Sequence, residues 1–156
     1  MNRPVRKAAA AAGFIRLILA LAGAAAQKAP DPKSDRDKAA LQGTWKWQSA
    51  ALAGDPFPAS EVRLMAMTFK GDQVMPSSDP TDMATFLLDP SKSPATIDFV
   101  DRGKSVDLGI YKIEGDVLTI CMALAQTRRP RPAAFESTKE NGALLIVMKK
   151  PPAPGK

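Results

Sequence analysis

Four dipeptides typical of tight turns divide this chain into short stretches of alternating apolar and polar residues. This spacing constrains the fold more than any other feature of the sequence. Glycine reaches the positive φ that two-residue hairpin loops need, so a Gly-Asp pair between two alternating stretches predicts an antiparallel hairpin. Two such pairs are present, and two further dipeptides mark additional turns. The four are Gly71-Asp72, Gly115-Asp116, Arg102-Gly103 and Asn141-Gly142.

The apolar stretches around these turns predict eight or nine short strands, in which period two places alternate side chains on one face. Short links between neighbours imply an up-and-down meander, and closure of a meander removes its exposed edges. We therefore predict an all-β fold, an up-and-down antiparallel β-barrel of about eight strands. The expected strands lie near 43–52, 64–70, 73–76, 83–88, 95–101, 105–113, 117–124, 133–138 and 143–149.

The first 26 residues are typical of a secretory signal peptide. Three basic residues precede an apolar stretch at 8–22, and small residues at 23–26 allow cleavage before Gln27. We expect export to the periplasm or the cell exterior, with no membrane span left after cleavage. Because Arg16 interrupts the apolar stretch, an uncleaved N-terminal anchor is the alternative.

The rest of the chain divides by composition into three parts. The polar, proline-containing residues 27–38 predict a flexible linker, 39–150 a single β domain, and 151–156 a disordered tail. The net charge is +6, but four basic residues lie within the first 26. A β domain this close to neutral is a poor candidate for nucleic-acid binding.

The absence of histidine and the presence of one cysteine exclude several kinds of catalytic and metal site. They exclude His-based catalytic triads, Cys-rich zinc clusters and an intramolecular disulfide. Cys121 lies in an apolar stretch, which favours a buried thiol; a reactive thiol and an intermolecular disulfide are the alternatives. No catalytic motif is present, so we expect no enzyme activity, no catalytic residue, no metal and no cofactor.

A series of short motifs runs in order through residues 40–149. In that order the motifs resemble a family of uncharacterised exported lipocalin-like domains of planctomycete bacteria. The resemblance implies a lipocalin-like barrel and export; the family has no established activity, so it implies no chemistry. Gly43-Thr44-Trp45 is similar to the lipocalin Gly-x-Trp, whose Trp closes one end of the barrel. The motifs span 41–46, 69–72, 88–92, 97–99, 109–116, 118–121 and 131–135.

One segment departs from the family pattern. Pro76 and Pro80 lie between Gln73 and Met83, where a regular strand is expected. Proline lacks the N–H that a sheet ladder needs. We therefore expect the barrel to be open or irregular on that side.

The leading functional hypothesis is a binding domain that holds a small apolar or amphipathic molecule in the barrel. Period two does not distinguish a filled interior from a cavity. The alternative is a packed barrel that acts through its outer surface, as a protein-interaction or structural module of the cell envelope. The residues expected to line the barrel are Trp45, Trp47, Met67, Phe69, Phe86, Phe99 and Tyr111.

The densest charge cluster of the β domain consists of Arg128, Arg129 and Arg131. One interpretation is a loop that binds an anion such as a phosphate, a sulfated glycan or a lipid head group. The other is a solvated turn.

Overall fold

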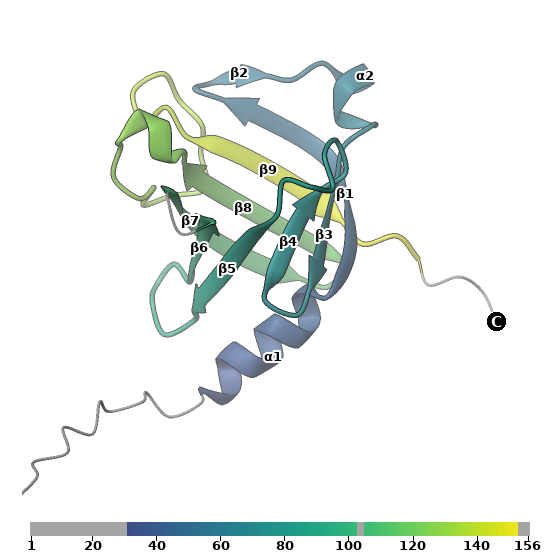
Figure 1. The fold of residues 1–156 in the computed structure, drawn as a ribbon. Coiled ribbons are helices and arrows are strands. Elements are labelled where there is room, and N and C mark those ends of the chain that lie inside the picture. Colours follow the sequence, from purple (N-terminus) through teal and green to yellow (C-terminus); the bar gives the residue numbers. More distant parts are fainter. Residues whose placement is uncertain (1–30, 103–104, 153–156) are drawn as a thin grey trace, which may run out of the picture.

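Eight antiparallel strands close into a barrel in the computed structural model, which describes residues 31–102 and 105–152 (Figure 1). Each strand of the barrel pairs with its neighbours in chain order, and β1 pairs with β9 to close the ring. The predicted all-β, up-and-down barrel is confirmed. The strands are β1 (Gly43–Leu52), β3 (Ala66–Lys70), β4 (Gln73–Pro76), β5 (Ala84–Asp89), β6 (Thr96–Asp101), β7 (Ser105–Glu114), β8 (Val117–Ala123) and β9 (Leu144–Lys149).

Tight turns set the register, as the glycines predict. Gly71 and Gly115 have φ of 62° and 63°, and each starts a two-residue loop between paired strands. The link from β1 to β3 carries a two-residue strand, β2 (Asp55–Pro56), paired with the end of β1. It also carries a short helix, α2 (Ala59–Val62).

The predicted irregular side is the junction between β4 and β5. These strands pair at two positions, Gln73 with Thr85 and Val74 with Ala84, whereas β5 and β6 pair at six. Pro76 ends β4, and the chain then loops through 77–83 before β5 begins. The barrel is closed, but its wall is short here.

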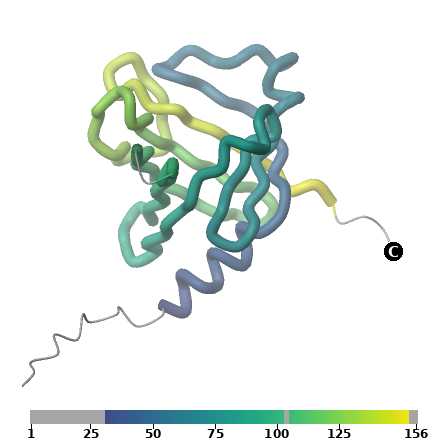
Figure 2. The backbone as a smooth tube through the Cα atoms, viewed as in Figure 1, coloured from purple at the N-terminus to yellow at the C-terminus, as the bar shows by residue number. Residues whose placement is uncertain are grey.

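A helix replaces most of the predicted linker. The linker prediction is wrong for residues 32–38, because α1 spans Pro32–Leu41. The Asp31 side chain caps the helix by accepting from the Lys33 N–H, and Pro32 occupies the first turn, where a missing N–H costs nothing. Figure 2 shows α1 below one end of the barrel. The signal-peptide prediction lies outside the described residues.

The prediction of a strand at 133–138 is also wrong. β8 pairs with β7 on one side and β9 on the other, which leaves no free edge for another strand. The link from β8 to β9 instead begins with a 3₁₀ turn, η1 (Ala125–Thr127), and continues without strand pairing across the outside of the barrel. There Phe135 packs against Ile110 and Cys121 in a small outer cluster.

The main hydrophobic core fills most of the barrel interior. Its buried side chains come from α1 and all eight barrel strands, and they alternate with outward-facing residues along each strand, as the sequence predicts. None of the helices in the described ranges combines the length and apolar character needed to cross a membrane. The core residues are Leu41, Trp45, Phe69, Val74, Phe86, Ile97, Phe99, Tyr111, Leu118, Ile120, Met122, Ile146 and Met148.

Candidate ligand site at the barrel mouth

Helix α1 closes one end of the barrel. Leu41, its last residue, is fully buried, and the indole N–H of Trp45 donates to the Leu41 carbonyl at 2.7 Å. The Lys150 ammonium lies 5.1 Å from the centre of a Trp45 ring. Trp45 therefore lies between the core and the helix, where its apolar area is buried and its one donor is satisfied.

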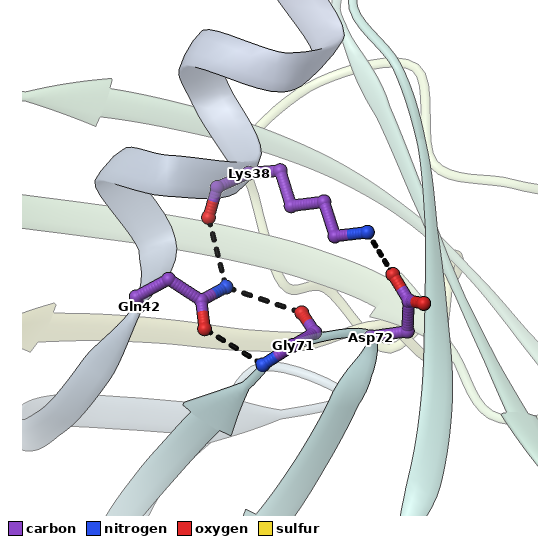
Figure 3. Close-up of polar contacts among 4 residues, drawn as sticks. All are labelled: Lys38, Gln42, Gly71 and Asp72. Carbon is purple, nitrogen blue, oxygen red and sulfur yellow. Dashed lines mark hydrogen bonds and ion pairs between the residues drawn. The ribbon is translucent and has the colours of Figure 1, made fainter.

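A polar clamp holds α1 against the hairpin between β3 and β4 (Figure 3). The Gln42 amide accepts from the Gly71 N–H at 2.8 Å and donates to the Gly71 carbonyl at 3.1 Å and to the Lys38 carbonyl at 2.9 Å. The Lys38 ammonium also pairs with the Asp72 carboxylate. Because Gln42 bonds both backbone groups of one glycine, the position of the hairpin relative to the helix is well defined.

Tyr111 joins the core to the same helix. Its hydroxyl donates to the Asp37 carboxylate at 2.6 Å, while its ring is buried. Burial, followed by the hydrogen bond to Asp37, raises the pKa of Tyr111 above its ordinary value of 10.0. Polar groups at this end thus find partners in α1.

Most of the residues expected to line a cavity form packed core instead. Trp45, Phe69, Phe86 and Tyr111 are all at most 3% exposed. The rings of Phe69 and Phe86 meet edge to face with centres 5.2 Å apart. Trp47 packs against the same core, and its buried indole N–H has no hydrogen-bond partner among the described residues.

The opposite end of the barrel holds a partly open pocket of about 280 Å³, called the mouth pocket below. It includes two of the predicted lining residues, Met67 and Phe99. The short pairing of β4 with β5 explains the position of the pocket. Beyond the pair Val74 and Ala84 the two strands are no longer hydrogen-bonded to each other, which leaves an opening in the barrel wall. Its lining residues in the described ranges are Met67, Val74, Pro76, Asp82, Ala84, Phe99, Asp101, Ser105, Asp107, Met122 and Gln126.

The polar part of this lining was not predicted from the sequence. Asp101 and Ser105 are partners at the end of the β6–β7 ladder. The Asp107 carboxylate accepts from the Ala125 N–H at 2.7 Å, which holds the start of η1 beside the pocket and places Gln126 there. The alternation of side chains along a strand could have predicted the position of Asp101. Asp101 follows Ile97 and Phe99 at every second residue, so it lies on the same inward face of the strand.

Two of the three candidate anion-binding arginines, Arg129 and Arg131, line one surface pocket of about 330 Å³ together with the acidic residues Glu136 and Glu140, whereas Arg128 does not line it. Arg131 donates from both terminal nitrogens to Asp98 and from one to the Gly109 carbonyl at 2.6 Å. Arg129 donates to the Glu140 carbonyl, and Arg128 is exposed in a left-handed backbone conformation. The anion site stays a prediction, and the Arg131 charge is already paired with a carboxylate.

Cys121 lies in the outer cluster and is fully buried. Its thiol donates to the Glu136 carbonyl at 3.3 Å. Burial raises the pKa of the thiol above its ordinary value of 9.0, which keeps it protonated and poorly nucleophilic. This placement agrees with the predicted buried thiol.

Alkaline pH should destabilise the protein through Tyr111 and Cys121. Both have folded pKa values raised above their unfolded values, so their contribution is complete below about pH 9 and is lost as the pH rises towards the folded values. Urea unfolding at intervals from about pH 8 to pH 11 should show a falling free energy of unfolding. Tyr111→Phe should make that fall shallower, and an unchanged slope in this variant would contradict the assignment.

Comparisons with known proteins found no match. No protein-family model matches the chain, and neither a curated protein nor a solved structure does so. The resemblance to exported lipocalin-like domains of planctomycete bacteria therefore stays a prediction. Within the described ranges, no group of three or more acidic or cysteine side chains is arranged so that it could hold a metal ion.

Proposed function

We propose that this chain is an exported, non-enzymatic binding protein that holds a small apolar or amphipathic molecule in the mouth pocket. The observation that carries the proposal is the pocket itself, about 280 Å³ at the end of the barrel away from α1. This volume is just below the ~300–1,000 Å³ typical of ligand pockets, so the proposed ligand is small. Export is proposed on the basis of the N-terminal sequence.

The apolar side of the pocket suits such a ligand. Met67 on β3 and Met122 on β8 are separated by β1 and β9 around the barrel, and Phe99 comes from β6. Thioether side chains adapt to irregular apolar surfaces at little conformational cost. The site proposed here is smaller than the one expected from the sequence, because the aromatic residues nearer α1 are packed core.

A second candidate function is an interaction through the outer surface. It is favoured by the filled interior and by the large apolar side chains Leu64 and Leu87, which are 82% and 57% exposed. An exported barrel of this kind would bind an envelope protein. If no small molecule binds in the mouth pocket, interaction through the outer surface becomes the favoured function.

Filling the mouth pocket tests the proposal. Ala84 lines it and is half-buried, so Ala84→Leu places extra methyl groups inside. We expect 1-octanol to bind the original protein saturably at one site in a calorimetric titration. Ala84→Leu should weaken that binding about tenfold, which corresponds to roughly 1.4 kcal/mol.

Thr85→Leu is the matched control. Thr85 is the next residue of β5 and is exposed on the outer face, so the same side chain adds no volume to the pocket. Octanol affinity should be unchanged in this variant, and circular dichroism should show both variants folded. Equal affinity in the two variants, or no saturable binding to the original protein, would refute the mouth pocket as the binding site.

A further inference from the structure

From the charges around the mouth pocket we infer that its ligand is an organic cation with a short apolar tail, such as an alkylammonium. This inference rests on the proposed function and narrows it to one ligand class. The apolar residues would hold the tail, and the acidic residues would face the cationic head.

Among the described lining residues of the mouth pocket, the charged side chains are all acidic. Asp82, Asp101 and Asp107 line it, and no lysine or arginine is among its described lining residues. Residues 27–156 carry 18 basic and 16 acidic side chains, a net charge of +2, so the acidic lining of the pocket stands against a nearly neutral domain. A concave site lined by charges of one sign raises the local concentration of counter-ions and ligands of the opposite sign.

Two of these carboxylates are available to a ligand. Asp107 accepts from the Ala125 N–H, whereas the side chains of Asp82 and Asp101 make no hydrogen bond or ion pair with the described residues. Asp82 is exposed and Asp101 is half-buried, so they form a partly hydrated rim. A carboxylate at such a rim keeps part of its hydration while it attracts a cation.

The apolar part of the pocket is compatible with a cation as well as with an alkyl chain. Phe99 provides an aromatic ring, and ring faces attract ammonium groups, quaternary ones included. A carboxylate-headed amphiphile would instead place its charge beside three aspartates, which is unfavourable.

The nearest described basic side chain in sequence, Arg102, is not among the lining residues of the pocket, but its guanidinium lies at the loop that supplies Asp82. Arg102 follows Asp101, and its guanidinium donates to the Thr81 carbonyl at 3.0 Å. The pKa of the Asp79 carboxyl is lowered mainly by two hydrogen bonds from Thr81, then by one from the Asp82 backbone, and least by the charge of Arg102. The positive charge of Arg102 is thus associated with the loop at 77–83 and does not line the pocket.

Three probes with the same tail test the inference on the full-length protein. Octyltrimethylammonium, 1-octanol and octanoate differ in head charge, and each is titrated below its aggregation concentration. The ammonium should bind about fivefold or more tightly than octanol, and octanoate should bind more weakly than either. Added sodium chloride should reduce the preference for the ammonium, because salt screens charges at an exposed rim.

The variant Asp82→Asn/Asp101→Asn should remove most of this preference, measured as the ratio of ammonium affinity to octanol affinity in the same variant. A matched control, Asp35→Asn/Asp116→Asn, makes the same charge change at the α1 end, where both residues are exposed. The control should keep the preference.

The outcomes separate the two proposals. Equal binding of all three probes, tightest binding of octanoate, or a preference unchanged by Asp82→Asn/Asp101→Asn would overturn the cationic ligand while the mouth pocket stands. Binding of none of the probes would overturn both. Selective binding of the ammonium that is lost in the rim variant and kept in the control would support the inference.

Discussion

Trp45→Ala is expected to lower the free energy of unfolding by about 3–5 kcal/mol, the range for removing a large aromatic side chain from a core. Trp45 is 1% exposed and packs at the end of the barrel that α1 closes. Alanine removes most of that buried area and also leaves the Leu41 carbonyl without its indole donor. Because small domains are stable by only about 5–15 kcal/mol, the loss would be a large part of the total.

Guanidinium unfolding of the purified domain measures this effect. Trp47→Ala is the control, since Trp47 lies two residues away on the same strand, is half-buried and has no hydrogen-bond partner for its indole within the described residues. We expect the Trp45 variant to lose clearly more stability than the Trp47 variant. Similar losses in both would show that the contact with α1 adds little.

Gly109→Val is the second large effect that we expect, a loss of about 3 kcal/mol from overpacking. Gly109 lies in the middle of β7, paired with Ile97 on β6 and Met122 on β8. A Cβ at this position would lie 2.9 Å from the Ile97 carbonyl oxygen and 3.3 Å from that of Cys121. Both oxygens belong to the neighbouring strands, so the ladder itself would have to shift.

Gly115→Ala separates this crowding from the ordinary penalty for replacing a glycine. Gly115 has φ of 63°, and a Cβ there would meet nothing within 4 Å. Its replacement should cost about 1 kcal/mol through backbone conformation alone. Thermal and urea unfolding should rank the Gly109 variant well below the Gly115 variant; the reverse order would show that the barrel wall yields easily at Gly109.

The strands and turns were predictable because their signals are local. Gly71 and Gly115 mark hairpins through their own backbone requirements, and alternation assigns each side chain to a face without knowledge of its neighbours. The placement of the seven expected lining residues in the interior followed from the same periodicity. Period two contains no information about whether an interior position is filled.

Helix α1 was missed although its capping signal was present. Asp31 followed by Pro32 is typical of a helix start, but the same residues are typical of a loop, and the segment has little apolar periodicity. The contacts that hold it are distant in sequence, such as Gln42 with Gly71 and Tyr111 with Asp37. They appear only when the barrel brings its end to the helix.

The sequence by itself determined the architecture of this protein, an up-and-down barrel with a weak junction at Pro76, since turn geometry and side-chain alternation act over a few residues. Only the tertiary structure decided which end of the barrel is filled and which is hollow. Helix α1 closes one end, and the short pairing of β4 with β5 leaves the mouth pocket at the other. The acidic lining arises in the same way, because Asp82, Asp101 and Asp107 line one pocket only when separate parts of the chain share one end of a closed sheet.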